Sequence, residues 1–554
     1  MQPPSRSQGD QRASMRWLAA SRVAALLAAA TLAGCAQTDG SMRSTGAPSP
    51  HRTPASGPRA AGASVPLSLF PLDDVPTAVS DVLPENASDR DAPLVPLDTQ
   101  LRWRDALVAR YVGTEADDGS PWLAETVEHG GGMLASVRLR AKVARYGNAG
   151  KSARRIGYGE NFRPHDQAWI ERIAANMRID ALAAARGARF EPARRAITVD
   201  NAPLRDLPTD DPHFYDFQLP GEGYPFDNLQ VSALRPATPV YRVSESADRQ
   251  WTYVLAPEAE GWVHSTTLAD ADPAFVRQWR AALRARPAAP LAASVALSDE
   301  AGRFRFAAPL GTLLPMLAAS SGDATATVLL PVADADGRAV VRRARLAAAD
   351  IAAVPWPATR AHFARLIGTL AGRPYGWGNA NGYNDCSAEL RSLLLPFGLW
   401  LPRHSSAQVD ALHVVDLSHA TPAARLAALR RNGQALLTLI DIGGHVMLYL
   451  GEADDHGVRT PFVYQNVWGL APADGSRRAV IGMGLVFPLH PDVPGHPTLQ
   501  SLAARKRFRL GLLVAPSGTA RPNAAAPPAV GASLDAAQAD DAATGQPGNP
   551  AEGH

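Results

Sequence analysis

A chain of 554 residues is too long for one hydrophobic core, so we expect about three or four domains plus terminal tails. Hydrophobic residues make up 46% of it and charged residues 19%, as in soluble globular proteins, while 45 Gly and 47 Pro favour turns, strands and linkers over a helical bundle. The 55 basic and 53 acidic side chains leave a net charge of only +2, which excludes the basic footprint of a nucleic-acid-binding protein.

The N-terminus has the pattern of an export signal. An apolar run over 23–32 matches a secretory signal in length and is too short to span a bilayer. It leads into Leu-Ala-Gly-Cys at 32–35, which resembles the lipobox of bacterial lipoproteins and implies a signal peptide over 1–35 with a lipid on Cys35. Ala36 in place of Asp then implies, in a Gram-negative host, an exported protein anchored in the outer membrane and facing the periplasm. The alternative is an ordinary signal peptide with an incidental cysteine.

A tether and a helical domain follow the signal. Residues 36–92 are rich in Ser, Thr, Pro, Ala and Gly without a sustained hydrophobic period, so we expect a disordered, flexible tether. Residues 93–230 are predicted to form a mostly helical N-terminal domain, because apolar side chains recur at helical spacing over 101–111 and 168–177. At the other end, residues 516–554 have a tether-like composition and are predicted to be disordered.

Short alternating strands replace the helical pattern after residue 230. They predict two small β-barrels, over 231–290 and 291–356, whose fragments resemble bacterial SH3 domains. The segments that carry the alternation or the Asp-Gly hairpin signal are 238–243, 250–255, 261–265, 326–332 and the turn at Asp336 and Gly337. The aromatic residues Trp251, Tyr253 and Trp262 are interpreted as barrel core; the alternative is that one or two of them line a ligand groove.

Cys386 stands where a catalytic thiol is expected, at the start of a helix. Asp385 is a good N-cap, and apolar side chains recur at helical spacing over 390–397. The positive end of the helix dipole and the first backbone N–H groups stabilise a thiolate, and they can also stabilise an oxyanion. We therefore predict that Cys386 is a nucleophile; the alternative is a buried structural thiol.

A nucleophilic cysteine needs a base and a group that orients it. His445 follows two glycines at the start of a predicted strand, and a second predicted strand over 461–468 carries Gln465. Adjacent antiparallel strands can hold the two side chains together, so that the amide oxygen of Gln465 accepts from one ring N–H and the other nitrogen faces the thiol. Asn466 is a fallback acceptor, although alternation places it on the other face. His404 lies nearby, but we interpret it as a loop residue.

Several short motifs together resemble the NlpC/P60 cysteine peptidases. These are Tyr-Gly-Trp-Gly at 375–378, Asp-Cys-Ser at 385–387, Leu-Pro-Arg-His-Ser-Ser at 401–406, Gly-His at 444–445, Tyr-Gln-Asn-Val-Trp-Gly at 464–469 and Gly-Glu-Gly-Tyr-Pro-Phe-Asp at 221–227. The resemblance is greatest to members in which a helical domain and two bacterial SH3 domains precede the catalytic domain. It implies a multidomain α+β fold with a papain-like catalytic domain over 357–515. Gln465 departs from the histidine that this subgroup often has, but it preserves a hydrogen-bond acceptor.

The resemblance also implies a substrate, the peptide stems of peptidoglycan. Family members cleave between γ-D-glutamate and diaminopimelate or lysine, and members with SH3 domains tend to require a free N-terminal L-Ala. Match of motif places Asp385 and Ser405 at the substrate's amino end, although Asp385 has the alternative of acting only as a cap. The other groove residues implied are Tyr375, Trp377 and Ser387. No cofactor or metal is expected, because the sequence has no cluster with ligand spacing.

Two other classes of function fit the same sequence. One is a non-catalytic envelope lipoprotein that binds cell-wall peptides through its SH3 domains. The other is an acyl- or amidotransferase that uses the same Cys386 and His445 pair with an amine in place of water. The intact Cys, His and acceptor residues favour hydrolysis over the binding protein. The partners we expect are thus stem peptides and, through Cys35, a membrane.

Overall fold

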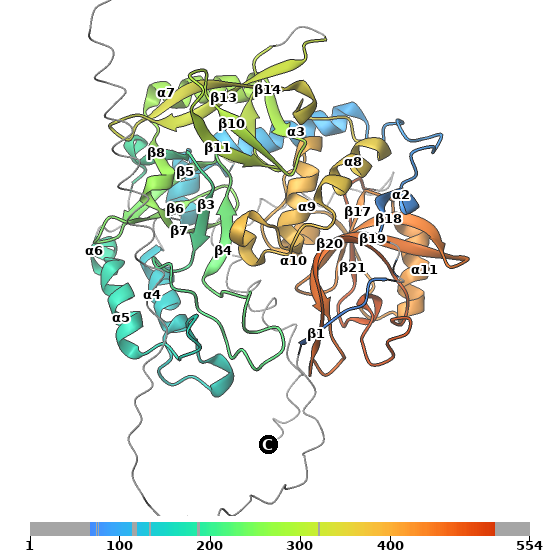
Figure 1. The fold of residues 1–554 in the computed structure, drawn as a ribbon. Helices are drawn as coiled ribbons and strands as arrows, with labels where there is room; N and C mark the ends of the chain where they lie inside the picture. The colour runs from blue at the N-terminus through green and yellow to red at the C-terminus, as the bar shows by residue number, and fades with distance from the viewer. Residues whose placement is uncertain are drawn as a thin grey trace, which may run out of the picture. The chain divides into compact units, whose positions relative to one another are not determined.

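The computed structural model describes residues 67–73, 75, 77–113, 119–131, 135–184, 189–318 and 322–515. The predicted signal peptide, Cys35, most of the predicted tether and the predicted tail lie outside these residues. From residue 67 on, the predicted tether instead contains a strand and a short helix, because apolar side chains such as Val82 and Leu83 are buried in the core. The described part combines helices with sheets, as the predicted α+β class requires (Figure 1).

The segment over 93–230 opens with helices, as the apolar spacing predicts. Leu107, Val108 and Tyr111 form the buried face of the first long helix. The helix near residue 168 begins at a cap, because the Asp166 carboxylate accepts from the Trp169 N–H at 2.7 Å. The helices here, with one short helix ahead of them, are α2 (Val79–Val82), α3 (Leu97–Val112), the π-helix η1 (Thr126–Gly131), α4 (Ala135–Tyr146), the 3₁₀ turn η2 (Ala153–Arg155), α5 (Gln167–Asn176) and α6 (Ile179–Ala184).

The first strand-rich region is an antiparallel sheet that starts earlier than residue 231. Two four-residue strands from the segment expected to be helical belong to it, and they are too short to display a period of two in the sequence. The strands, in the spatial order β4-β3-β7-β6-β5-β2-β8, are β2 (Arg195–Thr198), β3 (Ala202–Arg205), β4 (Gln230–Leu234), β5 (Pro239–Glu245), β6 (Trp251–Leu255), β7 (Glu260–His264) and β8 (Leu268–Asp270). The 3₁₀ turns η3 (Pro192–Arg194) and η4 (Ser265–Thr267) flank them.

The aromatic side chains of this sheet form core. Trp251, Tyr253 and Trp262 are buried in one cluster with side chains of α4 and α5, such as Tyr146 and Trp169. None of the three lines the cavity described below. The core interpretation is therefore confirmed, and these rings stabilise the contact between the sheet and the helices.

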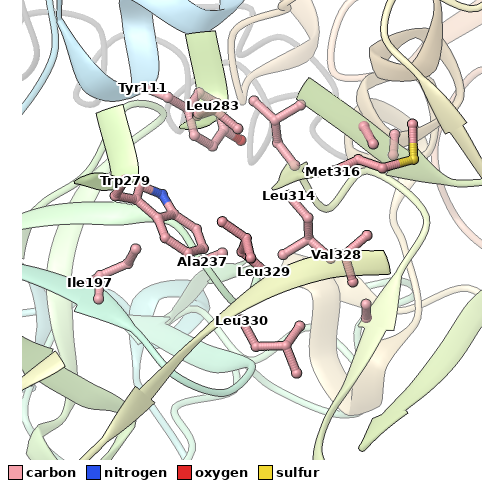
Figure 2. Close-up of a cluster of buried hydrophobic side chains, with 14 of the residues drawn as sticks. Tyr111, Ile197, Ala237, Trp279, Leu283, Leu314, Met316, Val328, Leu329 and Leu330 are labelled. Carbon is pink, nitrogen blue, oxygen red and sulfur yellow. The ribbon is translucent and has the colours of Figure 1, made fainter. Parts of the chain in front are cut away.

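A second group of strands follows the first sheet in the chain. It shares its core with α3 and with the helix α7 (Pro273–Ala285), which lies between the two groups of strands in sequence. Figure 2 shows Trp279 and Leu283 of that helix in one cluster with Leu314, Val328 and Leu330. The predicted hairpin turn is confirmed, because Gly337 has a φ of 78° between two long paired strands. The elements are α7 (Pro273–Ala285), β9 (Pro287–Pro290), β10 (Ser294–Ser298), β11 (Phe304–Pro309), β12 (Leu314–Pro315), β13 (Thr325–Ala333), β14 (Ala339–Ala347), η5 (Ala348–Asp350) and β15 (Ile351–Ala353).

The last part of the chain is a seven-stranded sheet in the order β1-β20-β19-β18-β17-β21-β16. All its pairs are antiparallel except β1 with β20. The strands are β1 (Leu67–Leu69), β16 (His413–Asp416), β17 (Thr438–Asp441), β18 (Val446–Asp455), β19 (Val458–Leu470), β20 (Arg478–Pro488) and β21 (Arg509–Leu512). The helices are α8 (Arg360–Leu370), η6 (Trp377–Gly382), α9 (Cys386–Leu394), η7 (Leu395–Phe397), α10 (Ser405–Asp410), α11 (Pro422–Asn432) and η8 (Leu502–Ala504).

Alternation along β18 gives this sheet two apolar faces. Val446, Leu448 and Leu450 pack into the core that α8 and α9 share with one face. Met447 and Tyr449 point the other way, into the core that includes α11. The helix α9, which begins at Cys386, is thus held against two strands (Figure 1). These are β18, which begins directly after His445, and β19, which carries Gln465.

The structure also bears on membrane insertion. Within the residues that the structure describes, no helix combines the length and the apolar character that crossing a bilayer requires.

Candidate active site

A cavity of about 220 Å³ lies where α9 begins and the β17–β18 turn ends. Every predicted catalytic or substrate-binding residue except Gln465 lines it: Tyr375, Trp377, Asp385, Cys386, Ser387, Ser405 and His445. Gln465 lies behind the histidine. The predicted lipid site at Cys35 is outside the described residues.

Cys386 is the first residue of α9, as the sequence predicts. The Asp385 carboxylate caps the helix by accepting from the Ala388 N–H at 3.0 Å. Leu390 and Leu393 bury the apolar face of α9, which fixes its rotation and directs its first residue to the cavity. Cys386 is only 7% exposed, yet its surface lines the cavity, and it is a thiol rather than half of a disulfide. The sulfur therefore sits in the electropositive environment of a helix start.

His445 is positioned by a tight turn and by one hydrogen bond. Gly443 and Gly444 both have positive φ angles, 78° and 69°, which glycine adopts readily and which shape this turn. The Ile442 N–H donates to the His445 carbonyl at 3.0 Å and closes it. The ring Nε2 lies 2.7 Å from Oε1 of Gln465, which is completely buried on β19. Because that oxygen only accepts, Nε2 carries the hydrogen and Nδ1 keeps its lone pair.

The surroundings keep this imidazole uncharged. Burial lowers the pKa of His445 to about 4, and the hydrogen bond to Gln465 opposes that shift only in part. At neutral pH the ring is thus a neutral base with Nδ1 available for a proton. A thiol and a neutral imidazole in one cavity are the two groups that nucleophilic catalysis by cysteine requires.

The Asp385 carboxylate has a second partner that sequence reasoning missed. Arg403 donates to both of its oxygens, at 3.1 and 2.5 Å, and to the Ser387 hydroxyl at 2.8 Å. Burial alone raises the pKa of Asp385, but the charge and hydrogen bonds of Arg403 outweigh it and hold the pKa below its ordinary value. Asp385 and Arg403 are 6% and 4% exposed, so they are a buried ion pair. Asp385 therefore caps the helix, and the charge of Arg403 balances its carboxylate.

Comparison with known proteins identifies the fold. Residues 212–264 match an SH3 domain of SH3b1 type, and residues 272–321 match an SH3 domain of SH3b2 type. Among solved structures, an NlpC/P60 endopeptidase from Photobacterium damselae subsp. piscicida is 24% identical with a TM-score of 0.67, and the match covers 80% of this chain and 98% of that one. The chain has the NlpC/P60 fold. The predicted resemblance to this family, with two SH3 domains, is confirmed.

Other comparisons add little. An NlpC/P60 family protein from Bacillus cereus ATCC 10987 is 16% identical with a TM-score of 0.36, over 55% of this chain and 98% of that chain. A search of curated proteins finds no match. Both SH3 matches begin before the predicted starts at 231 and 291, because the first takes in the loop that leads to β4 and the second takes in α7.

The SH3b1 region contributes directly to the cavity of the NlpC/P60 unit. Glu222 and Phe226, from the loop before β4, and Gln230, the first residue of β4, line the same cavity as Cys386 and His445. The Gln230 amide donates to the Gly378 carbonyl at 2.9 Å, and the Trp377 indole donates to the Asp227 carbonyl at 3.0 Å. The Gly-Glu-Gly-Tyr-Pro-Phe-Asp motif was the sequence signal for this segment, but nothing in the motif places it at the catalytic groups.

Among the other polar residues of the NlpC/P60 unit, Glu389 was not predicted, and Asn466 and His404 differ from their predicted roles. Glu389 lies one turn into α9 and accepts from the Tyr464 hydroxyl at 2.6 Å and the Asn384 amide at 2.7 Å; burial raises the pKa of Glu389 to about 7. Asn466 donates to the Asn384 carbonyl at 2.9 Å in the same network, so it is not the group that orients His445. His404 lines the cavity, and burial lowers its pKa to about 4, whereas the sequence suggested an ordinary loop residue.

The site has no arrangement typical of a metal centre. Among the residues that the structure describes, no group of three or more His, Cys, Asp or Glu side chains is arranged to hold a metal ion.

Proposed function

We propose that the chain is a cell-wall cysteine peptidase that cleaves the γ-D-glutamyl–diamino acid bond of peptidoglycan stem peptides with a free N-terminal L-Ala. One observation carries the proposal: Cys386 at a helix start and His445, fixed by Gln465, line the same cavity. The NlpC/P60 fold and the two SH3 domains support a cell-wall substrate. A protein that only binds cell-wall peptides would not need a histidine that is held in one tautomer by a hydrogen bond.

The proposed reaction begins with proton transfer from the Cys386 thiol to Nδ1 of His445. The sulfur then bonds to the γ-carbonyl carbon, and the first N–H groups of α9 stabilise the oxyanion. The C–N bond breaks as the imidazolium returns its proton to the leaving amine, which leaves a thioester on Cys386. His445 next takes a proton from water, the hydroxide attacks the thioester carbonyl, and the thiolate leaves and recovers the proton.

The substrate's ammonium group needs a carboxylate, and Glu222 fits that role better than Asp385. The Asp385 charge is already balanced by Arg403. Glu222 lines the cavity, and its carboxylate makes no hydrogen bond or ion pair within the described residues. Burial raises the pKa of Glu222 although three arginines oppose the shift, as expected for a carboxylate that lacks a close cation. Ser405, Tyr375 and Trp377 line the same cavity and are proposed to contact the dipeptide portion.

The test is hydrolysis of defined stem peptides by the purified chain, read by mass. We expect cleavage of L-Ala-γ-D-Glu-meso-diaminopimelate into the L-Ala-D-Glu dipeptide and the free diamino acid. The Cys386→Ala protein is expected to be inactive, and a peptide with an acetylated L-Ala amine is expected to be a much poorer substrate. Cleavage that survives Cys386→Ala would contradict the cysteine mechanism. Ligated peptides in place of two fragments would contradict hydrolysis.

Export and lipid attachment are part of the proposal and are supported by the sequence at 23–35. We expect the chain made in a Gram-negative host to incorporate an alkyne-tagged fatty acid and to fractionate with the outer membrane. Cys35→Ala is expected to lose the label, while Cys386→Ala keeps it and serves as the control for the other cysteine. Labelling that is equal in both variants would refute a lipid on Cys35.

A further inference from the structure

The wall of the catalytic cavity carries more positive than negative charge. Among the described residues, its charged side chains are Arg145, Arg403, Arg478, Arg505, Asp385 and Glu222. Arg403 and Asp385 balance each other. Arg145, Arg478 and Arg505 share the wall with one further carboxylate, that of Glu222, so the formal charge of the lining is positive and the cavity suits a substrate with negative charge.

Arg505 is held in place by a framework of buried polar groups. The guanidinium of Arg425, itself nearly inaccessible, donates to the Arg505 carbonyl at 2.6 Å and to the Ala503 carbonyl at 2.8 Å. Gln500 donates to the Ala504 carbonyl at 3.0 Å and accepts from Nη1 of Arg505 at 3.2 Å. This loop carries no part of the catalytic pair, yet it fixes a cation at the cavity wall.

Arg478 is fixed from a different direction. It is the first residue of β20, and its backbone is paired with Leu67 of β1. The chain at Gly221 passes so close that a Cβ there would lie 3.0 Å from Nε of Arg478, and Gly221 has a φ of 81°. Only glycine suits that position, so the loop before β4 packs directly onto this guanidinium.

The arginines follow an order across the cavity. Arg505 is close enough to His445 that its charge adds to burial in lowering the pKa of the imidazole. Arg478 and Arg505 line the same cavity, and Arg478 is in contact with Gly221, the residue that precedes Glu222. In the proposed reaction His445 protonates the leaving amine, whereas Glu222 receives the L-Ala amine. Arg505 is therefore on the leaving-group side.

We propose that Arg505, with Arg478 beside it, forms a subsite for a carboxylate of the diamino acid that leaves. This inference rests on the proposed function and names the part of the substrate that the cavity selects. The diamino acid offers two such groups. A side-chain carboxylate occurs in diaminopimelate and not in lysine, and a main-chain carboxylate is free in a tripeptide and not in a longer stem.

The test measures binding, so that it does not depend on turnover. Calorimetry on the full chain carrying Cys386→Ala would compare L-Ala-γ-D-Glu-meso-diaminopimelate with the same peptide amidated at the side-chain carboxyl, at the main-chain carboxyl or at the α-carboxyl of D-Glu. We expect one amidation on the diamino acid to weaken binding by about tenfold or more, as for a lost charge-assisted pair. If amidation of the side-chain carboxyl weakens binding, the subsite favours diaminopimelate over lysine. If amidation of the main-chain carboxyl weakens binding, the subsite favours released tripeptides over longer stems.

Variants then assign the effect to the arginine. Arg505→Gln is expected to abolish the difference between acid and amide, and Arg505→Lys to restore part of it, which shows that charge rather than folding is at stake. Arg477→Gln, a change in the residue next to Arg478 that does not line the cavity, is the control and should leave the difference intact.

Three results would overturn the proposal: no effect of either amidation on the diamino acid, an equal effect with and without Arg505, or an effect confined to the D-Glu carboxyl. Parallel assays on the chain with Cys386 intact separate the two claims. Failure to cleave any peptide, with the binding difference present, would reject the peptidase and retain the subsite.

Discussion

At the scale of single residues, the protonation state of His445 decides how Cys386 becomes reactive. A resting thiolate–imidazolium pair needs a histidine whose pKa is raised by a neighbouring negative charge. Here burial lowers the pKa of His445 to about 4, and its orienting partner is the neutral Gln465. The imidazole is therefore a neutral base at rest, and in the proposed reaction it becomes charged only when it takes the proton of Cys386.

This state predicts an unusually acidic pH limit for activity. Imidazole is active when neutral, and His445 gains its proton only as the pH falls through about 4 instead of its ordinary 6.5. The acid limb of kcat/KM against stem peptide is expected well below pH 6.5. The unfolded chain binds more protons in that interval, so folding stability contributed by this group also declines as pH falls from 6.5 toward 4.

A substitution of Gln465 that adds a negative charge provides the control, because it should shift the pKa of His445 in the opposite direction. Gln465→Glu places a buried carboxylate 2.7 Å from the ring, so it should raise the pKa of His445 and move the acid limb upward. An acid limb at or above pH 6.5 in the unmodified chain, or no movement in Gln465→Glu, would contradict the neutral-base account.

At the scale of elements, the start of α9 depends on a buried ion pair. Asp385 caps the helix through the Ala388 N–H while Arg403 neutralises its charge and reaches Ser232 of β4 at 2.9 Å. Removing one member leaves the other charge buried without a partner, which costs far more than a surface ion pair does. The helix that begins at Cys386 is therefore sensitive to a residue 17 positions along the chain.

We predict that Arg403→Met lowers the free energy of unfolding by about 3–5 kcal/mol. The measurement is urea denaturation followed by tryptophan fluorescence. The double variant Arg403→Met with Asp385→Asn removes both charges and is expected to recover part of the loss. A loss below about 1 kcal/mol in the single variant would show that solvent screens the pair as it does at a surface.

Local signals explain which elements were predictable. A cap at Asp385 followed by apolar side chains at helical spacing defines α9 from a dozen consecutive residues, and alternation defines β18 in the same way. The strands β2 and β3 escaped detection because four residues are too few to show a period. The roles of Arg403 and Glu222 depend on partners and a cavity assembled from distant parts of the chain, which no local pattern encodes.

At the scale of the whole molecule, the SH3b1 region completes the cavity rather than merely preceding it. The ring of Phe226 contacts Trp377 and Trp468 edge-on, with centroid distances of 5.2 and 5.5 Å. Both indoles belong to motifs of the NlpC/P60 unit. The SH3b1 region therefore helps to define the cavity that the substrate must enter.

Phe226→Ala is expected to raise KM by about tenfold and to change kcat much less, because the ring shapes the cavity and lies apart from the proton transfers. Steady-state kinetics on the tripeptide measures both constants. Tyr224→Ala is the matched control, since this ring of the same loop is 74% exposed and does not line the cavity. A fall in kcat with unchanged KM would assign Phe226 a different role.

The central claim is that Cys386 attacks the γ-carbonyl and carries the acyl group. Rapid acid quenching during turnover, followed by digestion and mass spectrometry, tests it directly. We predict that L-Ala-γ-D-Glu is attached as a thioester to the peptide that contains Cys386. Product formation with no such adduct, or with the adduct on another residue, would contradict it.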